Sequence, residues 1–310
     1  MPPRFRHVAI VGPGAIGSCL AVRLAVAEDG PRVTLVDYRP DRAARLSNRP
    51  VILHTPSGDL EAPLVVRTAP ETPPDLVILA VKAYAVRAAA EAAAGWIGRA
   101  PLLAIQNGLG AAADAARALP WTTLITAVSY QAANTAGEGE VHHVANLVTY
   151  LGYEGRPPDA TVEAVADLLA RAGLPAALEA DMTPRVWGKL LVNAAINPVA
   201  ALAGVTNGEV AARFTLRALA AAIAGEGEAA AQAEGVRLPY ARAAEAVMET
   251  ARETAANRCS MLQDLDAGRQ TEIDYLNGAL VRAAEAHGLP APANRAVTAL
   301  VKQVAARAAT

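Results

Sequence analysis

Cysteine, lysine and long apolar runs are scarce in this chain of 310 residues. The two cysteines, Cys19 and Cys259, have no metal-type spacing, which argues against a disulfide framework and against a zinc site. Apolar runs such as Leu76–Val81 are far shorter than the ~18 residues that span a bilayer. Since the chain passes from Met1 almost directly into a strand-like run, we expect a soluble cytoplasmic protein with no membrane partner.

A large excess of charge of one sign is also missing. The 28 basic and 30 acidic residues leave a net charge of −2, which disfavours a nucleic-acid partner. With 53% hydrophobic residues the chain is not disordered, and at roughly 150 residues per domain its length favours two domains. Only Lys82, Lys189 and Lys302 are lysine, so these positions are candidates for a role that needs a compact ammonium with a tunable pKa.

The first half of the chain alternates short apolar strands with helices. We expect an amphipathic helix from Ala15 to about Glu28, and a second helix over Ala83–Ala94. Four apolar runs fit buried parallel strands: His7–Val11, Val33–Val36, Leu76–Val81 and Leu102–Ile105. This alternation predicts an α/β fold with an N-terminal Rossmann-type doubly wound sheet. We expect Thr122–Tyr153 to form the antiparallel edge of the same sheet.

The second half is helical, and strand signals largely vanish beyond Asp181. Alanine-rich helical stretches are separated by glycine and proline, at Leu216–Ala233, Ala241–Ala256, Ile273–His287 and Ala293–Ala308. We therefore predict a Rossmann domain over residues 1–180 and an all-α domain over residues 181–310. The apolar helices of the second domain are a candidate homodimer interface.

A glycine-rich turn directly follows the first predicted strand. Gly12-Pro13-Gly14-Ala15-Ile16-Gly17 has the G-x-G-x-x-G spacing and opens a helix, the context that makes this motif specific. Gly12 permits a tight turn, Gly14 lets the backbone approach a pyrophosphate, and Gly17 allows close packing of helix on sheet. Since a helix N-terminus attracts anions, we predict a dinucleotide cofactor, against the alternative of a purely structural turn.

The residues after the second strand bear on which coenzyme binds. Asp37 ends that strand, where a carboxylate accepts hydrogen bonds from the adenosine ribose hydroxyls and repels a 2′-phosphate, which favours NADH. Arg39 and Arg42 follow closely, and their guanidinium groups suit the 2′-phosphate of NADPH. The choice between NADPH and NADH stays open at this point.

Further polar residues follow two of the predicted strands. Lys82 follows Leu76–Val81, and Gln106-Asn107-Gly108 follows Leu102–Ile105. Both segments therefore lie at the carboxyl ends of parallel strands, the edge at which open α/β sheets bind ligands. Ordinary turn residues are the alternative for each.

A polar stripe runs along an otherwise apolar helix in the second half. Thr183 resembles an N-cap with Pro184 at the first helical position, so Lys189, Asn193 and Asn197 recur at i, i+4 and i+8 on one face. Polar groups inside a buried helix need partners or line a cavity. The stripe therefore predicts a functional site in a cavity lined by these three side chains. The alternative is that they only form hydrogen bonds to the other domain.

Three shorter polar segments follow the stripe. Asn207-Gly208-Glu209 reads as a polar turn or the start of a helix, and Ser260 begins a second segment that ends at Asp264. Thr271 resembles an N-cap that places Glu272 in the first turn of a helix, where the helix dipole favours a carboxylate. The histidines form no metal-binding motif, so we expect no metal, and the chain has no G-x-S-x-G elbow.

Taken in order, these segments resemble the ketopantoate reductases (2-dehydropantoate 2-reductases) over essentially the whole chain. The matching segments are Gly12–Gly17, Val81-Lys82, Gln106-Asn107-Gly108, Lys189/Asn193/Asn197-Pro198, Asn207-Gly208-Glu209, Ser260–Asp264 and Thr271–Asp274. The resemblance implies a dinucleotide-binding domain and a helical substrate-binding domain. It also implies reduction of 2-dehydropantoate to (R)-pantoate by NADPH or NADH, a step of pantothenate and coenzyme A synthesis.

The resemblance also assigns roles by position. It implies that Lys189 is the catalytic proton donor and that Glu272 is a second catalytic residue near the coenzyme. Substrate contacts are implied at Asn193, Asn197, Asn207 and Ser260, coenzyme contacts at Lys82 and Ala133, and contacts to both at Asn107. Asp37 departs from the family, which usually prefers NADPH.

The implied chemistry suits these residue types, because an ammonium stabilises the growing charge on the ketone oxygen and gives up its proton there. Burial lowers the pKa of a lysine, and a nearby Glu272 opposes that effect. Two alternatives stay open: an NAD-dependent dehydrogenase of another 2-keto or 2-hydroxy acid, such as mandelate, and a non-catalytic nicotinamide-binding sensor.

Overall fold

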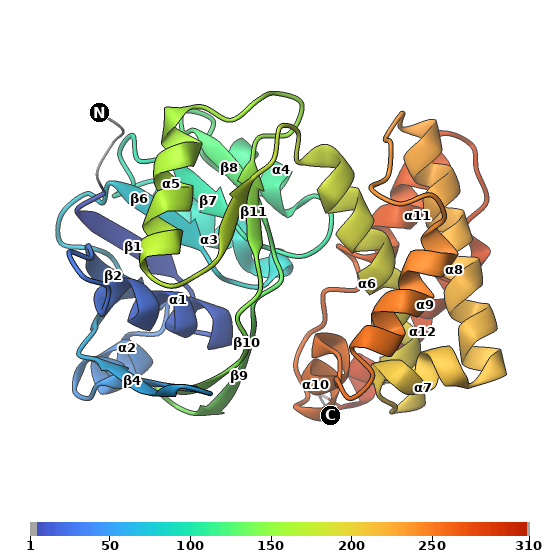
Figure 1. Cartoon of the computed structure of the whole chain (residues 1–310), viewed down its shortest axis with the longest axis horizontal. Helices are drawn as coiled ribbons and strands as arrows, with labels where there is room; N and C mark the ends of the chain where they lie inside the picture. Colours follow the sequence, from blue (N-terminus) through green and yellow to red (C-terminus); the bar gives the residue numbers. More distant parts are fainter. Residues whose placement is uncertain (1–4, 309–310) are drawn as a thin grey trace. The chain divides into compact units, whose positions relative to one another are not determined.

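Short buried strands assemble into one large sheet. In the computed structural model, which describes residues 5–308, eight strands lie in the order β12-β11-β8-β7-β6-β1-β2-β5 (Figure 1). They are β1 His7–Val11, β2 Arg32–Val36, β5 Val65–Arg67, β6 Leu76–Leu79, β7 Leu102–Ala104, β8 Leu124–Ser129, β11 Thr149–Gly152 and β12 Ala176–Leu178. The strands from β5 to β8 are parallel, and only β11 and β12 run the other way. The predicted doubly wound Rossmann-type sheet is confirmed.

The direction of the crossovers sets the layers. The chain moves from β1 to β2 towards one edge and from β6 through β7 to β8 towards the other, so right-handed crossovers place their helices on opposite faces. Alternate strand residues such as Val8, Ile10 and Ile78 pack in one core with α1 (Ala15–Ala25) and α5 (Ala160–Arg171). On the other side, α3 (Val86–Ala93) contacts α4 (Ala111–Ala118).

A second sheet covers α1, and the sequence did not reveal it. It has the order β4-β3-β10-β9 and contacts α1. Its strands are β3 Val51–Thr55, β4 Gly58–Ala62, β9 Ala132–Gly137 and β10 Glu140–Ala145. The predicted antiparallel edge over Thr122–Tyr153 is therefore wrong for three strands and right for β11. β8 is buried and runs parallel to β7, as is typical of an inner strand of an α/β sheet. The alternating exposure of β10 instead suits the half-solvated second sheet, where it pairs with β3.

Beyond residue 182 the described structure is helical. The helices are α6 Thr183–Ala203, α7 Asn207–Ala212, α8 Phe214–Ala233, α9 Ala243–Glu253, α10 Ser260–Asp266, α11 Asn277–Ala286 and α12 Pro292–Ala308. α6 contacts α7, α8, α9, α10 and α12, so it is the central helix of this bundle. By length and composition α6 is also apolar enough to cross a membrane, but 72% of its apolar window is buried, which fits a core helix.

One predicted helix starts later than expected. We predicted a helix over Ile273–His287 with Thr271 as its N-cap, but α11 begins at Asn277 and residues before it form turns. The reason is that the Tyr275 carbonyl accepts a hydrogen bond of 2.9 Å from the Leu109 backbone N–H, which comes from outside the helix. The predicted cap is therefore wrong, and Glu272 lies in a turn that precedes the helix.

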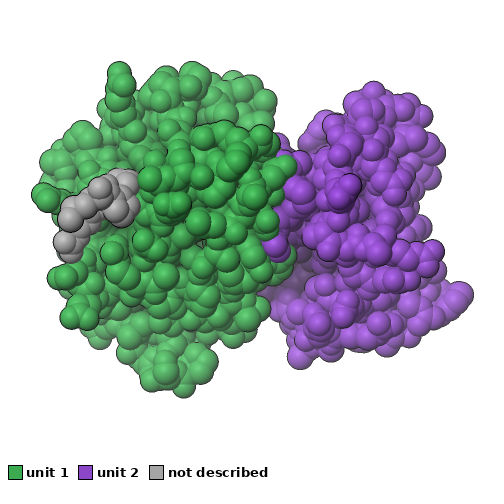
Figure 2. Space-filling model, turned by 45° about the horizontal axis from the view of Figure 1, so that its top comes forward, with its two compact units in different colours: residues 1–106, 111–182 green, residues 107–110, 183–310 purple. Residues whose placement is uncertain are grey.

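The contacts divide the chain into two units, coloured separately in Figure 2. Unit 1 comprises residues up to 106 together with 111–182, and unit 2 comprises residues 107–110 together with the chain from 183 onwards. The short segment Asn107–Gly110 therefore belongs with the helices, although it follows β7 in the sequence.

Candidate active site

The three glycines of the G-x-G-x-x-G turn have different surroundings. Gly12 has a φ of +108°, and a Cβ added there would lie 2.8 Å from Val81 Cγ1. A Cβ on Gly17 would lie 2.0 Å from the Gly12 carbonyl oxygen, so packing of helix on sheet requires both glycines. A Cβ on Gly14 would meet no atom within 4 Å. The space over the first turn of α1 thus fits the pyrophosphate of a dinucleotide, which the backbone N–H groups there are suited to bind.

This turn lies where the strand order reverses, between β1 and β6. Lys82 follows β6 and is the N-cap residue of the short 3-10 helix η1, Ala83–Ala85. Gln106, in the loop after β7, bonds to the loop after β6: its Nε2 donates to the carbonyl oxygens of Leu79 at 2.7 Å and Val81 at 3.1 Å. The structure therefore brings the glycine turn and the segment of Lys82 to one switch point of the sheet, as the strand ends predicted.

Pro13, Ala15, Ile16 and Ala133, which were also predicted to bind the cofactor, lie in or close to α1. Pro13 is in the glycine turn, and Ala15 and Ile16 begin α1. Ala133 lies in β9, a strand of the second sheet that contacts α1.

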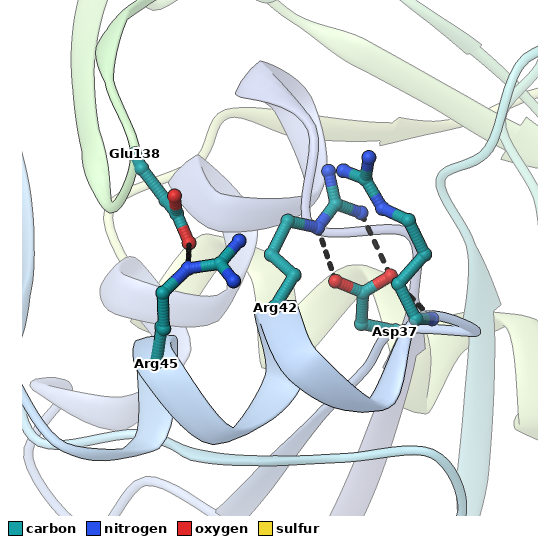
Figure 3. Close-up of polar contacts among 5 residues, drawn as sticks. Asp37, Arg42, Arg45 and Glu138 are labelled. Atoms are coloured by element: carbon teal, nitrogen blue, oxygen red, sulfur yellow. Dashed lines mark hydrogen bonds and ion pairs between the residues drawn. The ribbon is translucent and has the colours of Figure 1, made fainter.

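Asp37 is engaged by an arginine (Figure 3). It directly follows β2 and is fully buried, at 0% exposure. Its Oδ1 accepts hydrogen bonds from Arg42 Nη2 at 2.8 Å and from the Arg39 backbone N–H at 3.1 Å, while Arg42 Nε donates to Oδ2. Arg42 belongs to α2 (Pro40–Ser47), so both carboxylate oxygens are already held by residues at the start of that helix.

In unit 2, α6 carries the predicted polar stripe. Lys189 and Asn193 are half-buried and Asn197 is buried, on a helix most of whose residues are buried. Burial lowers the pKa of Lys189 to about 8 from its ordinary value of 10.5, and attraction to the Glu272 carboxylate acts in the opposite direction. The structure therefore places a lysine of reduced basicity within electrostatic reach of a buried glutamate.

The starts of α7 and α10 meet close to the end of this stripe. Asn207 is the first residue of α7, and its backbone N–H donates to the Asn257 carbonyl at 3.0 Å. Ser260 is the first residue of α10, and the neighbouring Cys259 Sγ lies 3.5 Å from the Asn197 carbonyl oxygen. Of the two alternatives for Asn207-Gly208-Glu209, the helix start is confirmed: Glu209 Oε2 accepts from the Thr206 backbone N–H at 3.0 Å.

One side-chain acceptor in this region has no partner. Asn207 Nδ2 donates to Thr254 Oγ1 at 2.9 Å, and that hydroxyl donates in turn to the Thr250 carbonyl at 2.7 Å. Since the hydroxyl hydrogen is already used, Thr254 can only accept from Asn207, which fixes the orientation of the amide. The opposite atom, Asn207 Oδ1, is buried without a hydrogen-bond partner among the described residues.

The two residues after Asn107 lie against the turn that carries Glu272. Gly108 has a φ of +89°, and a Cβ there would lie 2.2 Å from the Tyr275 carbonyl oxygen. The Leu109 N–H donates to the same carbonyl at 2.9 Å. The glycine therefore allows the segment Asn107–Gly110 to pack closely on this turn of the helical unit.

The predicted residues thus fall into two groups. Unit 2 holds Asn107, Lys189, Asn193, Asn197, Asn207, Ser260 and Glu272, and unit 1 holds the glycine turn, Asp37, Lys82 and Ala133. The network of the buried Asn277 and Asn294 with Glu226 was not predicted from the sequence, since its members lie on three different helices. Over the described part of the chain, residues 5–308, no group of three or more metal-ligating side chains is found.

A doubly wound sheet with this glycine turn, followed by a helical unit that carries a lysine of lowered pKa, is typical of nicotinamide-dependent oxidoreductases. Two family models match the chain, ketopantoate reductase PanE/ApbA over residues 8–155 and its C-terminal counterpart over residues 181–305. The chain belongs to the ketopantoate reductase family, which confirms the family predicted from the sequence.

Individual relatives agree over almost their full length. A 2-dehydropantoate 2-reductase of Halobacterium salinarum is 34% identical, over 96% of this chain and 98% of its own. The crystal structure of a PanE/ApbA family ketopantoate reductase from Ralstonia eutropha JMP134 has a TM-score of 0.89 and 31% identity, and covers 98% of this chain and 100% of its own. A D-mandelate dehydrogenase with NADH and anilino(oxo)acetate also has a TM-score of 0.89, covering 97% and 99%, but its 23% identity shows only the shared fold.

Proposed function

We propose that the protein reduces 2-dehydropantoate to (R)-pantoate, with Lys189 as the proton donor. The observation that carries this proposal is the lysine on the polar face of α6, whose burial lowers its pKa to about 8. Membership of the ketopantoate reductase family supports the choice of substrate over other 2-keto acids, including the keto acid that corresponds to mandelate.

The bound reduced nicotinamide supplies the hydride that adds to C2 of the keto acid. Lys189 stabilises the negative charge that grows on the C2 oxygen and then gives this oxygen its proton. With a pKa of about 8, the ammonium is largely protonated at neutral pH and yet more acidic than an exposed lysine. Glu272 keeps the ammonium charged, because its carboxylate opposes the loss of the proton.

Neutral polar side chains are proposed to hold the substrate. Asn193 and Asn197 share the face of Lys189, and Ser260 starts the helix packed against α6. The unpartnered Asn207 Oδ1 is suited to accept a hydrogen bond from the substrate hydroxyl. These groups bind a carboxylate and a hydroxyl without adding charge that would shift the pKa of Lys189 further.

We infer that NADPH is the preferred coenzyme. Asp37 is predicted at the ribose position, but its carboxylate is buried in an ion pair with Arg42, which cancels its repulsion of a 2′-phosphate. Arg42 uses only part of its donor set on Asp37, and the side chain of Arg39 is exposed beside it. Under this proposal Asp37 positions Arg42, and the two guanidinium groups bind the phosphate.

The test follows oxidation of the reduced coenzyme with 2-dehydropantoate, using NADPH and NADH in parallel with wild type and Lys189→Ala. We expect rapid turnover with NADPH and a loss of kcat of at least about a hundredfold in the variant, in line with general acid catalysis. Phenylglyoxylate, the keto acid that corresponds to mandelate, serves as the competing substrate. A higher kcat/KM on that keto acid than on 2-dehydropantoate rejects the pantoate assignment.

We also propose that the enzyme acts in the cytoplasm as a homodimer through its helical unit. Both cysteines are free and buried, which suits a reducing compartment. Leu300 and Val304 are exposed one turn apart on α12, at 54% and 39%, and provide an apolar strip for a second copy. Light scattering after size exclusion tests this, and a monomeric wild type contradicts it.

A further inference from the structure

A proline interrupts α6 within its most buried stretch. In a helix each backbone N–H donates to the carbonyl four residues earlier, but Pro198 has no N–H to give to Ala194. Ala194 is fully buried, at 0% exposure, so water cannot replace that hydrogen bond. A buried carbonyl without a donor is costly, and a donor from another part of the chain is therefore needed.

Asn277, the first residue of α11, supplies this donor. Its Nδ2 donates to the Ala194 carbonyl oxygen at 2.9 Å and to Asn294 Oδ1 at 2.9 Å, and its exposure is 0%. Because both neighbours are acceptors, only the NH₂ side of the amide fits between them. The remaining atom, Asn277 Oδ1, is buried without a partner among the described residues, so the two donated bonds decide the orientation.

The second acceptor is itself held in place. Asn294 Nδ2 donates to Glu226 Oε2 at 2.8 Å and to the Ile223 carbonyl at 3.2 Å, which turns its Oδ1 towards Asn277. Glu226 also accepts from the backbone N–H of Ala293 at 2.8 Å, so it holds the first turn of α12. A continuous line of hydrogen bonds therefore connects α6, α11, α12 and α8.

The bond from Asn277 joins two parts of the candidate site. Asn193 directly precedes Ala194, and Asn197 directly precedes the proline. Glu272 lies in the turn that leads directly into α11. Fixing Asn277 on the Ala194 carbonyl thus fixes the proposed substrate face of α6 against the turn that carries the glutamate.

We propose that Asn277 is a positioning residue for the reduction: it pairs with the carbonyl freed by Pro198 and so sets the placement of Asn193 and Asn197 relative to Glu272. The role rests on the proposed reductase function. It does not require Asn277 to touch substrate or coenzyme.

The first experiment measures stability in a cycle of Asn277→Ala, Pro198→Ala and the double variant. Asn277→Ala leaves two buried acceptors without a donor and is expected to lower Tm by about 5 °C. In the Pro198→Ala background residue 198 has an N–H for Ala194, so the same change should cost about half as much. Equal losses of Tm in both backgrounds overturn the pairing.

The second experiment measures kcat for 2-dehydropantoate and the Kd of NADPH by calorimetry. Asn277→Ala removes the donor to the Ala194 carbonyl, and Pro198→Ala gives that carbonyl a helical N–H that competes with Asn277. Each is therefore expected to lower kcat about tenfold, with no further loss in the double variant. The Kd should stay within about twofold, because the glycine turn lies in the other unit. Asn277→Asp, which keeps the size but replaces the donor, should lose as much kcat as Asn277→Ala.

Thr298→Val is the matched control, because it removes a nearby bond of 2.7 Å from Thr298 Oγ1 to the Asn294 carbonyl without touching Ala194. It should lower Tm and keep kcat, and a tenfold loss of kcat here shows that Asn277 is merely structural. Full kcat in Asn277→Ala and in Pro198→Ala, with an active wild type, overturns the positioning role alone. A wild type that reduces no 2-keto acid overturns the proposed function as well.

Discussion

At the scale of single residues, the electrostatics of Lys189 determine how activity depends on pH. A proton donor with a pKa of about 8 is charged below that pH, so kcat at saturating coenzyme is expected to fall as pH rises through about 8. Glu272→Gln removes the carboxylate that raises this pKa and should move the fall to lower pH. The measurement is kcat against pH for both proteins.

Asp274→Asn is the control for that experiment, because this carboxylate belongs to the same turn but pairs with Lys302 at 2.6 Å. It should leave the alkaline limb in place. A limb that stays near pH 8 in Glu272→Gln contradicts the proposed coupling of Lys189 to Glu272. Lys302 was one of the three lysines proposed as candidates because lysine is scarce in this chain. Its exposed ion pair with Asp274 is one that an arginine could form equally well, so the rarity of lysine alone does not identify a functional residue.

At the same scale, Arg42 is expected to determine the preference for NADPH over NADH. If Arg42 binds the 2′-phosphate, Arg42→Ala should lower the ratio of kcat/KM for NADPH over NADH by about 10- to 100-fold, the value of a charge-assisted hydrogen bond. Arg45→Ala is the matched control, because Arg45 lies on the same helix but pairs with Glu138 at 3.0 Å (Figure 3). The Kd of each coenzyme, measured by calorimetry, gives a second readout. An unchanged ratio in Arg42→Ala returns Asp37 to the role of ribose acceptor.

At the scale of elements, the glycine turn and α1 separate stability from binding. Gly14→Val places a side chain in open space, so Tm should stay within about 2 °C while NADPH binding weakens by at least about tenfold. Gly17→Val instead drives a Cβ into the Gly12 carbonyl and should lower Tm sharply. Thermal unfolding and calorimetric Kd check both. Gly14→Val with normal coenzyme affinity removes the turn from the proposed site.

How far an element was predictable depended on how local its causes are. The stripe on α6 was predicted from periodicity alone, because i, i+4 and i+8 positions share a face in any helix. The start of α11 was not predictable, since the Tyr275 carbonyl bonds to Leu109 from a distant part of the chain. The second sheet was missed for the same reason, because β10 pairs with β3, which lies far earlier in the sequence.

The network around Asn277 shows most clearly which interactions could not be predicted from the sequence. Pro198 is visible in the sequence and signals a carbonyl that lacks its helical donor. Nothing local says that the donor comes from Asn277 or that Asn294 and Glu226 orient it, because each residue lies on a different helix. A proline in a helix therefore indicates that a carbonyl needs another donor, whereas the group that donates is determined only by the packing of the helices.

At the scale of the whole molecule, the chain builds two separate hydrophobic cores. One core joins the sheets with α1 and α5, and the other surrounds α6. Their chain segments interchange only at residues 107–110, which leave the first unit and join the second. Separate cores favour separate cooperative transitions.

We therefore expect calorimetry to resolve two unfolding transitions, each of which responds to a substitution in its own core. Leu35→Ala and Leu191→Ala form a matched pair, since both leucines are fully buried, at 0% exposure, one in each core. Each truncation should cost about 2–5 kcal/mol and lower one transition by several degrees. NADPH should raise the transition that Leu35→Ala lowers, because the glycine turn belongs to that unit. A single transition that both variants lower equally would mean that the two units unfold as one, and coenzyme binding would then stabilise the helical unit to the same extent.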